Sequence, residues 1–200
     1  KTHQSNYWLL FELIWSDFFK YIGLKHGSSI FQINGINGKS ENWKRDKVLF
    51  DKWATATRGI PFIDANMREL NLTGFMSNRG RQNVASFFVT ELGLDWRMGA
   101  AYFESKLLDY DVTSNYGNWM YIAGVGNDPR DRYFNVILQA KRYDAKGDYI
   151  RFWLPELSEL TETIHHPWTK PKGLFQSESF HLERDYYLPM ITPNYWDKHY

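Results

Sequence analysis

Two carboxylates and two side-chain amides lie close together in the segment 95–129, where large aromatic residues surround them. They are Asp109, Asp111, Asn115 and Asn118. A buried polar group that finds no hydrogen-bond partner costs about 1–3 kcal/mol of folding free energy. These four side chains therefore either satisfy one another or hold a ligand.

A calcium ion is the first ligand that this pattern suggests, and the spacing argues against it. Asp109 and Asp111 begin like a calcium-binding loop, but Thr113 and Ser114 stand where such a loop needs a ligand and a glycine. Met120 replaces the glutamate that closes the loop. The sequence thus predicts no metal site, and the spacing alone favours a solvated loop.

Composition and charge restrict the classes of partner. The chain has 200 residues, about one domain, with a formal net charge of +1, so any affinity for nucleic acid must come from a local patch. Aromatic residues make up 18% of the chain, which suits planar partners such as flavins or bases. The absence of cysteine excludes disulfides and a cysteine nucleophile, and is typical of an intracellular protein in the nucleus, the cytoplasm or an organelle. No apolar run approaches the roughly 20 residues of a membrane span, so we expect no membrane partner. We also expect a monomer.

The first element that must position the polar groups is a helix predicted over residues 6–25. Trp15 alone is typical of a core residue, but Glu12 beside it leaves a binding role open. Apolar residues recur at three- and four-residue steps, as on the buried face of a helix: Trp8, Phe11, Trp15, Phe18 and Ile22.

The middle of the chain predicts further helices with clear starts. One covers residues 46–57, and the next begins at Pro61, a residue favoured in the first helical turn. Asp64 and Arg68 stand four residues apart and are predicted to pair on its surface. Ser77 is predicted to cap the helix that follows.

The remaining elements predict an all-α, multi-helix fold with an irregular end. Residues 98–108 have helical spacing, and a polar turn separates them from the apolar residues 119–122. Helices are also predicted over 133–143 and 155–160, whereas 163–200 are rich in Pro, His and Tyr and predicted to be irregular. No segment alternates convincingly with the period of two that strands require.

Five motifs in order resemble the photolyase/cryptochrome family of flavoproteins. The first to stand out is DYDVTSNYGNW, which resembles the flavin-binding signature of that family. The others are FELIWSDFF, GIPFIDANMRELNLTGFMSNRGRQNVASFF, DWRMGAAYFE, and AGVGNDPRDRYFN through WLPEL. The resemblance covers residues 7–157, and NRGRQN, WRMGA and the tyrosine in NWMY are most similar to the DASH-type cryptochromes.

This resemblance implies a domain organisation and its cofactors. Residues 1–160 would form part of the helical FAD-binding domain, with 161–200 as an irregular segment packed on it. The α/β antenna domain and the Thr/Ser-rich phosphate cradle that precede it in the family are absent from this sequence. We therefore expect these 200 residues alone to bind FAD weakly and to be inactive. An antenna folate, methenyltetrahydrofolate, is expected in the full-length protein at a site outside this chain.

The resemblance also assigns roles to individual residues. Arg81 would pair with Asp109 beside the flavin, and Asn115 would face the N5 atom of its ring. The residues implied to hold or tune FAD are Asn78, Arg81, Asp109, Asp111, Asn115 and Trp119. Those implied to contact DNA are Glu12, Trp15, Asn78, Arg79, Tyr121 and Gln139. Those implied to relay electrons to the flavin are Trp43, Trp96 and Trp119.

Two departures from the family pattern concern the substrate side. Ser16 stands where an arginine commonly follows ELIW, and Tyr121 stands where many photolyases have a second tryptophan. The activity implied is repair of cyclobutane pyrimidine dimers, preferentially in single-stranded DNA, by electron transfer from reduced FAD under blue light. The alternatives are a blue-light photoreceptor that signals through the flavin redox state, and a flavin-free helical nucleic-acid module.

Overall fold

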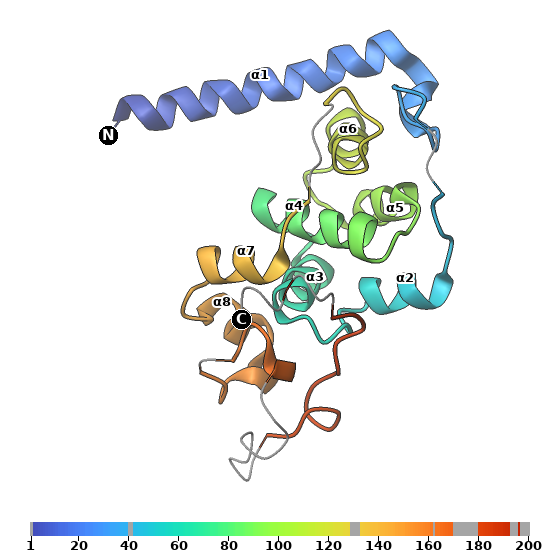
Figure 1. Ribbon diagram of the computed structural model, residues 1–200. Coiled ribbons are helices and arrows are strands. Elements are labelled where there is room, and N and C mark those ends of the chain that lie inside the picture. Colours follow the sequence, from blue (N-terminus) through green and yellow to red (C-terminus); the bar gives the residue numbers. More distant parts are fainter. Residues whose placement is uncertain are drawn as a thin grey trace.

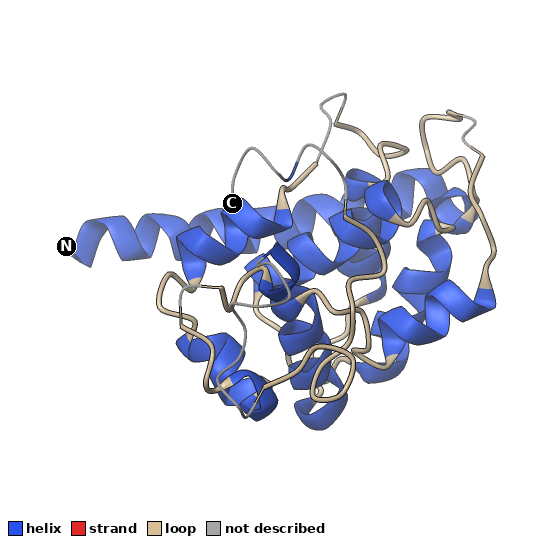
Figure 2. Cartoon of the chain, turned by 60° about the horizontal axis from the view of Figure 1, so that its bottom comes forward, coloured by secondary structure: helices blue, strands red, loops and turns tan. Residues whose placement is uncertain are grey.

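The structure is a computed structural model, and its regular elements are helices, as the all-α prediction requires (Figures 1 and 2). It describes residues 2–39, 42–128, 133–161, 163–169, 180–192 and 196. Within these ranges the α-helices are α1 (Thr2–His26), α2 (Lys47–Ala54), α3 (Pro61–Thr73), α4 (Asn78–Ser86), α5 (Trp96–Lys106), α6 (Val112–Ile122), α7 (Val136–Tyr143) and α8 (Asp148–Trp153). Shorter 3₁₀ or π turns are η1 (Gly27–Phe31), η2 (Phe87–Glu91), η3 (Pro155–Leu157) and η4 (Pro167–Thr169).

Two helices, α6 and α3, lie at the centre of the fold, and the other helices pack around them. Helix α6 packs between α1 and α5, while α3 contacts α4, α7 and α8 (Figure 1). The N-terminal half of α1 extends past the other helices in both views (Figures 1 and 2). In the described part of the chain, no helix is both long and apolar enough to span a membrane.

Two glycines let α6 approach its neighbours closely. A β-carbon at Gly99 of α5 would overlap the indole ring of Trp119, and one at Gly117 of α6 would overlap the ring of Phe19. Interiors are packed to crystal density, so neither overlap could be absorbed without moving a helix. The two glycines therefore fix Trp119 against α5, and α6 against α1.

The predicted apolar stripe on α1 is confirmed at Ile22 but wrong at Trp8, Phe11 and Phe18. Phe19 and Ile22 are buried, whereas Trp8 is 53% exposed and Phe11 and Phe18 are also exposed. The reason is that only the C-terminal half of α1 packs on α6, and it does so through the ring of Phe19. The helix period alone could not reveal which side of α1 would meet a partner.

The predicted helix starts are confirmed by their caps. The Asp46 carboxylate accepts a hydrogen bond from the Leu49 backbone at 3.0 Å, and α3 begins at Pro61. The Ser77 hydroxyl accepts one from the Gly80 backbone, also at 3.0 Å. These signals act within one helical turn, which is why sequence alone reveals them.

The polar turn predicted before Trp119 is wrong. Helix α6 already begins at Val112, so Asn115 and Asn118 are helical residues. Their polarity suggested a turn because the helix face that carries them lines a cavity instead of the apolar core. The preceding helix ends at Lys106 and leaves Leu108 exposed.

The boundaries near the end of the chain also differ from the prediction. Helix α7 begins at Val136, capped by Asn135, three residues later than expected. Helix α8 was not predicted, because six residues are too few to show a helical period. The helix expected over 155–160 is a single 3₁₀ turn, Pro155–Leu157.

Asp64 and Arg68 do not form the predicted surface pair. Asp64 is fully buried and accepts hydrogen bonds from the backbone N–H groups of Arg58 and Gly59 and from the hydroxyl of Tyr186. Burial raises the pKa of Asp64 to about 6, although these hydrogen bonds oppose the rise. Tyr186 belongs to a segment 122 residues away, so the local four-residue spacing gave the wrong partner.

Arg68 instead binds a residue of the later chain. Its guanidinium donates to both carboxylate oxygens of Glu156, at 2.6 and 3.0 Å, and to the Trp153 carbonyl at 2.9 Å. Such bidentate arginine–carboxylate pairs are directional as well as strong. Helix α3 is therefore tied by Arg68 to the end of α8 and by Asp64 to the segment 180–192.

Replacing Tyr186 with phenylalanine is expected to lower the free energy of unfolding by about 1–3 kcal/mol, because the buried Asp64 loses a donor. The hydroxyl lies 2.6 Å from Oδ2 of Asp64. The loss should grow as the pH rises through about 6, where Asp64 becomes charged and needs the donor most. Denaturant unfolding at several pH values measures it.

The neighbouring Tyr187 provides the matched control, because it is 50% exposed. Its replacement by phenylalanine should leave the free energy of unfolding almost unchanged. Equal losses in the two variants would show that the hydroxyl of Tyr186 does not stabilise the fold.

Candidate functional site

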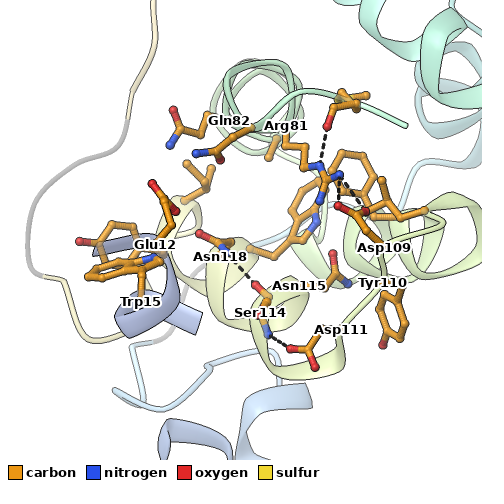
Figure 3. Close-up of a pocket in the computed structure, with 18 of the residues that line it drawn as sticks. Glu12, Trp15, Arg81, Gln82, Asp109, Tyr110, Asp111, Ser114, Asn115 and Asn118 are labelled. Atoms are coloured by element: carbon orange, nitrogen blue, oxygen red, sulfur yellow. Dashed lines mark hydrogen bonds and ion pairs between the residues drawn. The ribbon is translucent and has the colours of Figure 1, made fainter. Parts of the chain in front are cut away.

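A cavity of about 840 Å³ opens between α1, α4 and α6 (Figure 3). Its volume lies within the range of roughly 300–1,000 Å³ that is usual for small-molecule and cofactor sites. Nine residues predicted from sequence line it: Glu12, Trp15, Asn78, Arg81, Asp109, Asp111, Asn115, Trp119 and Tyr121.

Helical spacing brings the polar lining together. Arg81 and Gln82 follow Asn78 on α4 by three and four residues, and Asn115 and Asn118 lie three apart on α6. Residues at these steps share one helix face. Asn118, one of the four polar groups singled out from the sequence, lines the cavity, whereas sequence reasoning missed Gln82, although the step of four from Asn78 was a usable signal.

The pair of Arg81 with Asp109 is present as the resemblance implies. The Nη2 atom of Arg81 lies 2.8 and 2.9 Å from the two carboxylate oxygens, and its Nε donates to the Met76 carbonyl at 2.8 Å. The Asp109 side chain is 59% exposed, and such pairs contribute about 1 kcal/mol or less to stability. The pair therefore serves mainly to hold the guanidinium at the cavity wall.

Asp111 caps α6 as well as lining the cavity. Its Oδ1 accepts a hydrogen bond from the Ser114 backbone at 2.8 Å and one from the Thr113 hydroxyl at 2.8 Å. The Ser114 backbone N–H is the largest influence that lowers the pKa of Asp111. The charged carboxylate thus fixes the start of the helix that carries Asn115.

Asn115 is held in one orientation. Its Nδ2 donates to the Ala100 carbonyl of α5 at 3.0 Å, and the side chain is almost buried. The hydrogen bond to Ala100 fixes the orientation of the amide and leaves its oxygen as an acceptor for a ligand (Figure 3). Asn118 donates similarly to the Ser114 carbonyl, at 2.8 Å.

The cavity has an aromatic wall and an aromatic rim. The wall is Trp119, which is 2% exposed, packs edge-on against Phe103 at 5.2 Å and is fixed over Gly99. The rim is formed by Trp15 and Tyr121, whose rings meet edge-to-face at 5.9 Å. Figure 3 shows Trp15 and Glu12 on the opposite side of the cavity from Arg81 and Asp109.

The chemistry of this lining fits an isoalloxazine ring. Such a ring is a flat aromatic system with a polar edge, and the cavity offers an aromatic wall together with a guanidinium and several amides. Arg81 can donate to ring oxygens, whereas Asn115 presents an acceptor. The lining that a flavin needs is therefore present in the described residues.

Two predicted DNA contacts lie outside the cavity. Arg79 donates to Oε1 of Gln82 at 2.7 Å, and its guanidinium lies over the ring of Tyr143 at 4.9 Å. Gln139 on α7 has a buried side-chain oxygen that lacks a hydrogen-bond partner in the described part of the chain. Their roles toward DNA remain predictions.

The three tryptophans to which the resemblance assigns the relay lie on different elements: Trp119 on α6, Trp96 at the start of α5 and Trp43 in the loop before α2. Their relay role remains a prediction. Trp119 packs on Gly99, and Trp96 lies one helical turn before it, fully buried. Trp43 is half-buried and precedes Lys44, whose backbone pairs with Gly93 and Asp95 at 2.9 Å. The backbone pairing brings the segment that carries Trp43 to the start of α5, the helix whose first residue is Trp96.

Comparison with known proteins identifies a family. The family described as the FAD binding domain of DNA photolyase matches residues 8–198. Cryptochrome DASH of Synechocystis is 56% identical over 96% of this chain and 40% of its own length. Cryptochrome DASH of Danio rerio is 52% identical over 99% of this chain and 38% of its own length. The chain thus spans about two fifths of these curated relatives.

Solved structures agree with the sequence relatives. The Synechocystis cryptochrome superposes with a TM-score of 0.90 at 52% identity, covering 93% of this chain and 39% of its own. A class III photolyase from Agrobacterium tumefaciens gives 0.84 at 35% identity, covering 90% and 38%. An archaeal photolyase from Sulfolobus tokodaii, described with two FAD molecules, gives 0.78 at 32% identity, covering 92% and 41%.

Proposed function

The chain belongs to the photolyase/cryptochrome family as its FAD-binding domain, and from this we propose that the whole protein uses blue light and reduced FAD to repair cyclobutane pyrimidine dimers in DNA. One observation carries the proposal. A single cavity holds both a polar and aromatic lining that suits a flavin and a rim of Trp15 and Tyr121 that suits a base.

The polar side of the cavity would hold the flavin ring. We assign Arg81, Asp109 and Asn78 to its polar edge, Asn115 to its N5 atom, and Trp119 to the wall beside it. When bound, FAD supplies the photochemistry and the electron, and the protein supplies binding and orientation. The packed interface between α5 and α6 would exclude water from this side of the cavity.

The Asn115 amide suits a reduced flavin for an electrostatic reason. Its oxygen is available as an acceptor because its nitrogen donates to Ala100. A neutral acceptor can accept a hydrogen bond from a protonated ring nitrogen without adding a second negative charge to a reduced ring. A carboxylate at this position would repel that ring at close range.

The rim would receive the damaged bases. An enzyme that acts on a base in DNA must take it out of the stack, at a cost of a few kcal/mol that is least in a single strand. Stacking on an aromatic side chain returns about 1–3 kcal/mol per base. Trp15 and Tyr121 offer two such rings, and Glu12 lines the cavity beside them.

Light sensing through the flavin redox state is the second candidate function. It is favoured by the buried Trp96 and Trp119, to which the resemblance assigns an electron relay, because refilling the flavin with electrons serves a redox signal as well as repair. It needs the flavin side of the cavity but not the rim.

A repair assay decides between the two functions. The full-length protein with reduced FAD is illuminated with blue light in the presence of a single-stranded oligonucleotide that carries one thymine dimer, and dimer loss is measured by chromatography. We expect light-dependent loss that is absent in the dark. A protein that binds FAD but leaves the dimer intact would overturn repair and favour sensing.

A further inference from the structure

Tyr116 connects the buried Trp96 to the surface. The two rings meet at 6.2 Å in an edge-to-face arrangement, and Tyr116 also packs against Phe31 of η1 at 4.7 Å. Its hydroxyl donates to Oε2 of Glu104 at 3.1 Å. Glu104 is an exposed residue of α5, so the phenol joins a fully buried indole to a carboxylate in contact with water.

The nearby tryptophans lack such an acceptor. The indole N–H of Trp96 donates to the Ile33 carbonyl at 3.0 Å, and an amide carbonyl is too weak a base to take a proton. The indole nitrogen of Trp43 is buried and has no hydrogen-bond partner among the described residues. An oxidised aromatic side chain lasts longer once its proton has left. Tyr116 combines a ring contact to Trp96 with a carboxylate positioned to take that proton.

Resting on the proposed function, we propose that Tyr116 is the terminal electron donor of the relay, with Glu104 as the acceptor of its proton. The proposal adds two residues that the tryptophan relay does not include. Because Tyr116 is only half-buried, external reductants can reach it and return the electron there.

The step balances in electrons and protons. An electron that has left Trp96 for the cofactor side of the relay leaves a positively charged indole. One electron then passes from the phenol of Tyr116 to that indole, the O–H bond of Tyr116 breaks, and a new O–H bond forms on Glu104. The products are neutral Trp96, a neutral tyrosyl radical and a protonated carboxyl group. A small thiol or ascorbate later returns the electron, and Glu104 returns the proton.

The charges around the phenol keep it protonated at rest. Burial and the hydrogen bond to Glu104 raise the pKa of Tyr116 to about 12. The other titratable groups that face it are Arg97 of α5 and Tyr110 of the loop before α6. Arg97 forms an ion pair with Asp95, in which Nη2 lies 2.7 Å from Oδ2. Electron and proton must therefore leave Tyr116 together.

Transient EPR of the FAD-loaded full-length protein tests the proposal, because tryptophan and tyrosine radicals differ in their hyperfine patterns. We expect a tyrosyl signal after illumination, with a slower rise in D₂O because an O–H bond breaks in the same step. Tyr116→Phe should lose this signal. Glu104→Gln keeps a hydrogen-bond acceptor but removes the base, and should lose the signal too.

Tyr102→Phe is the matched control. Tyr102 also carries a hydrogen-bonded hydroxyl on α5, but its ring contacts Trp53 at 5.4 Å. Its replacement should leave the tyrosyl signal intact. A signal that survives in Tyr116→Phe, or that disappears in Tyr102→Phe, would overturn the assignment. Absence of any photoinduced radical in the unmodified protein would also overturn the assignment, whereas failure of that protein to repair dimers with chemically reduced FAD would count against the proposed function.

Discussion

Replacing Trp96 with phenylalanine is expected to abolish light-driven reduction of oxidised flavin while FAD stays bound. Trp96 is fully buried on α5, three residues before the Gly99 on which Trp119 packs, and its ring contacts Tyr116 at 6.2 Å. In the implied relay it is the middle member, between Trp119 and Trp43. Phenylalanine retains an apolar ring in the core but is far harder to oxidise. Flavin absorption followed under blue light with an external reductant measures the effect.

Trp53 supplies the control for this experiment. It is also fully buried, and its ring lies 6.3 Å from that of Trp119, but it is not a member of the implied relay. Trp53→Phe should therefore photoreduce, and Trp96→Phe should still repair dimers when its flavin has been reduced chemically beforehand. Normal photoreduction in Trp96→Phe would mean that the electron takes another route, such as Trp53 and Tyr102.

The second large effect is expected on the preference for single-stranded over duplex DNA. We predict efficient repair of dimers in single-stranded DNA and poor repair in intact duplex. Tyr121 presents a smaller ring than tryptophan, and Ser16 lacks a positive charge, so less of the cost of flipping is recovered. Tyr121→Trp should narrow the gap between the two substrates. Trp15→Ala should weaken single-strand binding by roughly fivefold to 150-fold, as the loss of about 1–3 kcal/mol of stacking requires.

The same helix provides a control for the rim. Trp8 is exposed and does not line the cavity, so Trp8→Ala should leave single-strand affinity unchanged. Fluorescence anisotropy with a labelled dimer-containing strand gives the affinities, and a repair assay on both substrates gives the ratio. Equal repair of duplex and single strand by the unmodified protein would refute the prediction.

Local signals account for what the sequence could predict of the fold. Asp46, Pro61 and Ser77 mark helix starts through contacts within one turn. Five ordered motifs then indicated the family, and through it the pairing of Arg81 with Asp109. These inferences needed no knowledge of which surfaces meet.

Long-range packing accounts for what could not be predicted. Asp64 is buried because Tyr186, from the far end of the chain, closes over it. Phe19 faces the core instead of Phe18 because Gly117 of α6 leaves room for its ring. The polar face of α6 suggested a turn because a cavity, not the core, lies beside it.

The sequence could predict which residues line the candidate site, but not how their side chains are oriented. Helical spacing from Asn78 would also have included Gln82. By contrast, the engagement of the Asn115 nitrogen by Ala100 and the capping role of Asp111 depend on how α5 and α6 pack. Only the folded chain shows that the amide oxygen is the group left for a ligand.

The central claim is that the cavity beside Arg81 binds the flavin ring, and the FAD content of purified full-length protein tests it most directly. We expect about one FAD per chain in the unmodified protein. In Arg81→Ala the affinity should fall roughly tenfold to a hundredfold, because a charged hydrogen-bond donor contributes about 1.5–3 kcal/mol. Arg79→Ala, two residues away on the same helix but outside the cavity, should keep its FAD. Equal FAD content in all three proteins would contradict the placement of the flavin in this cavity.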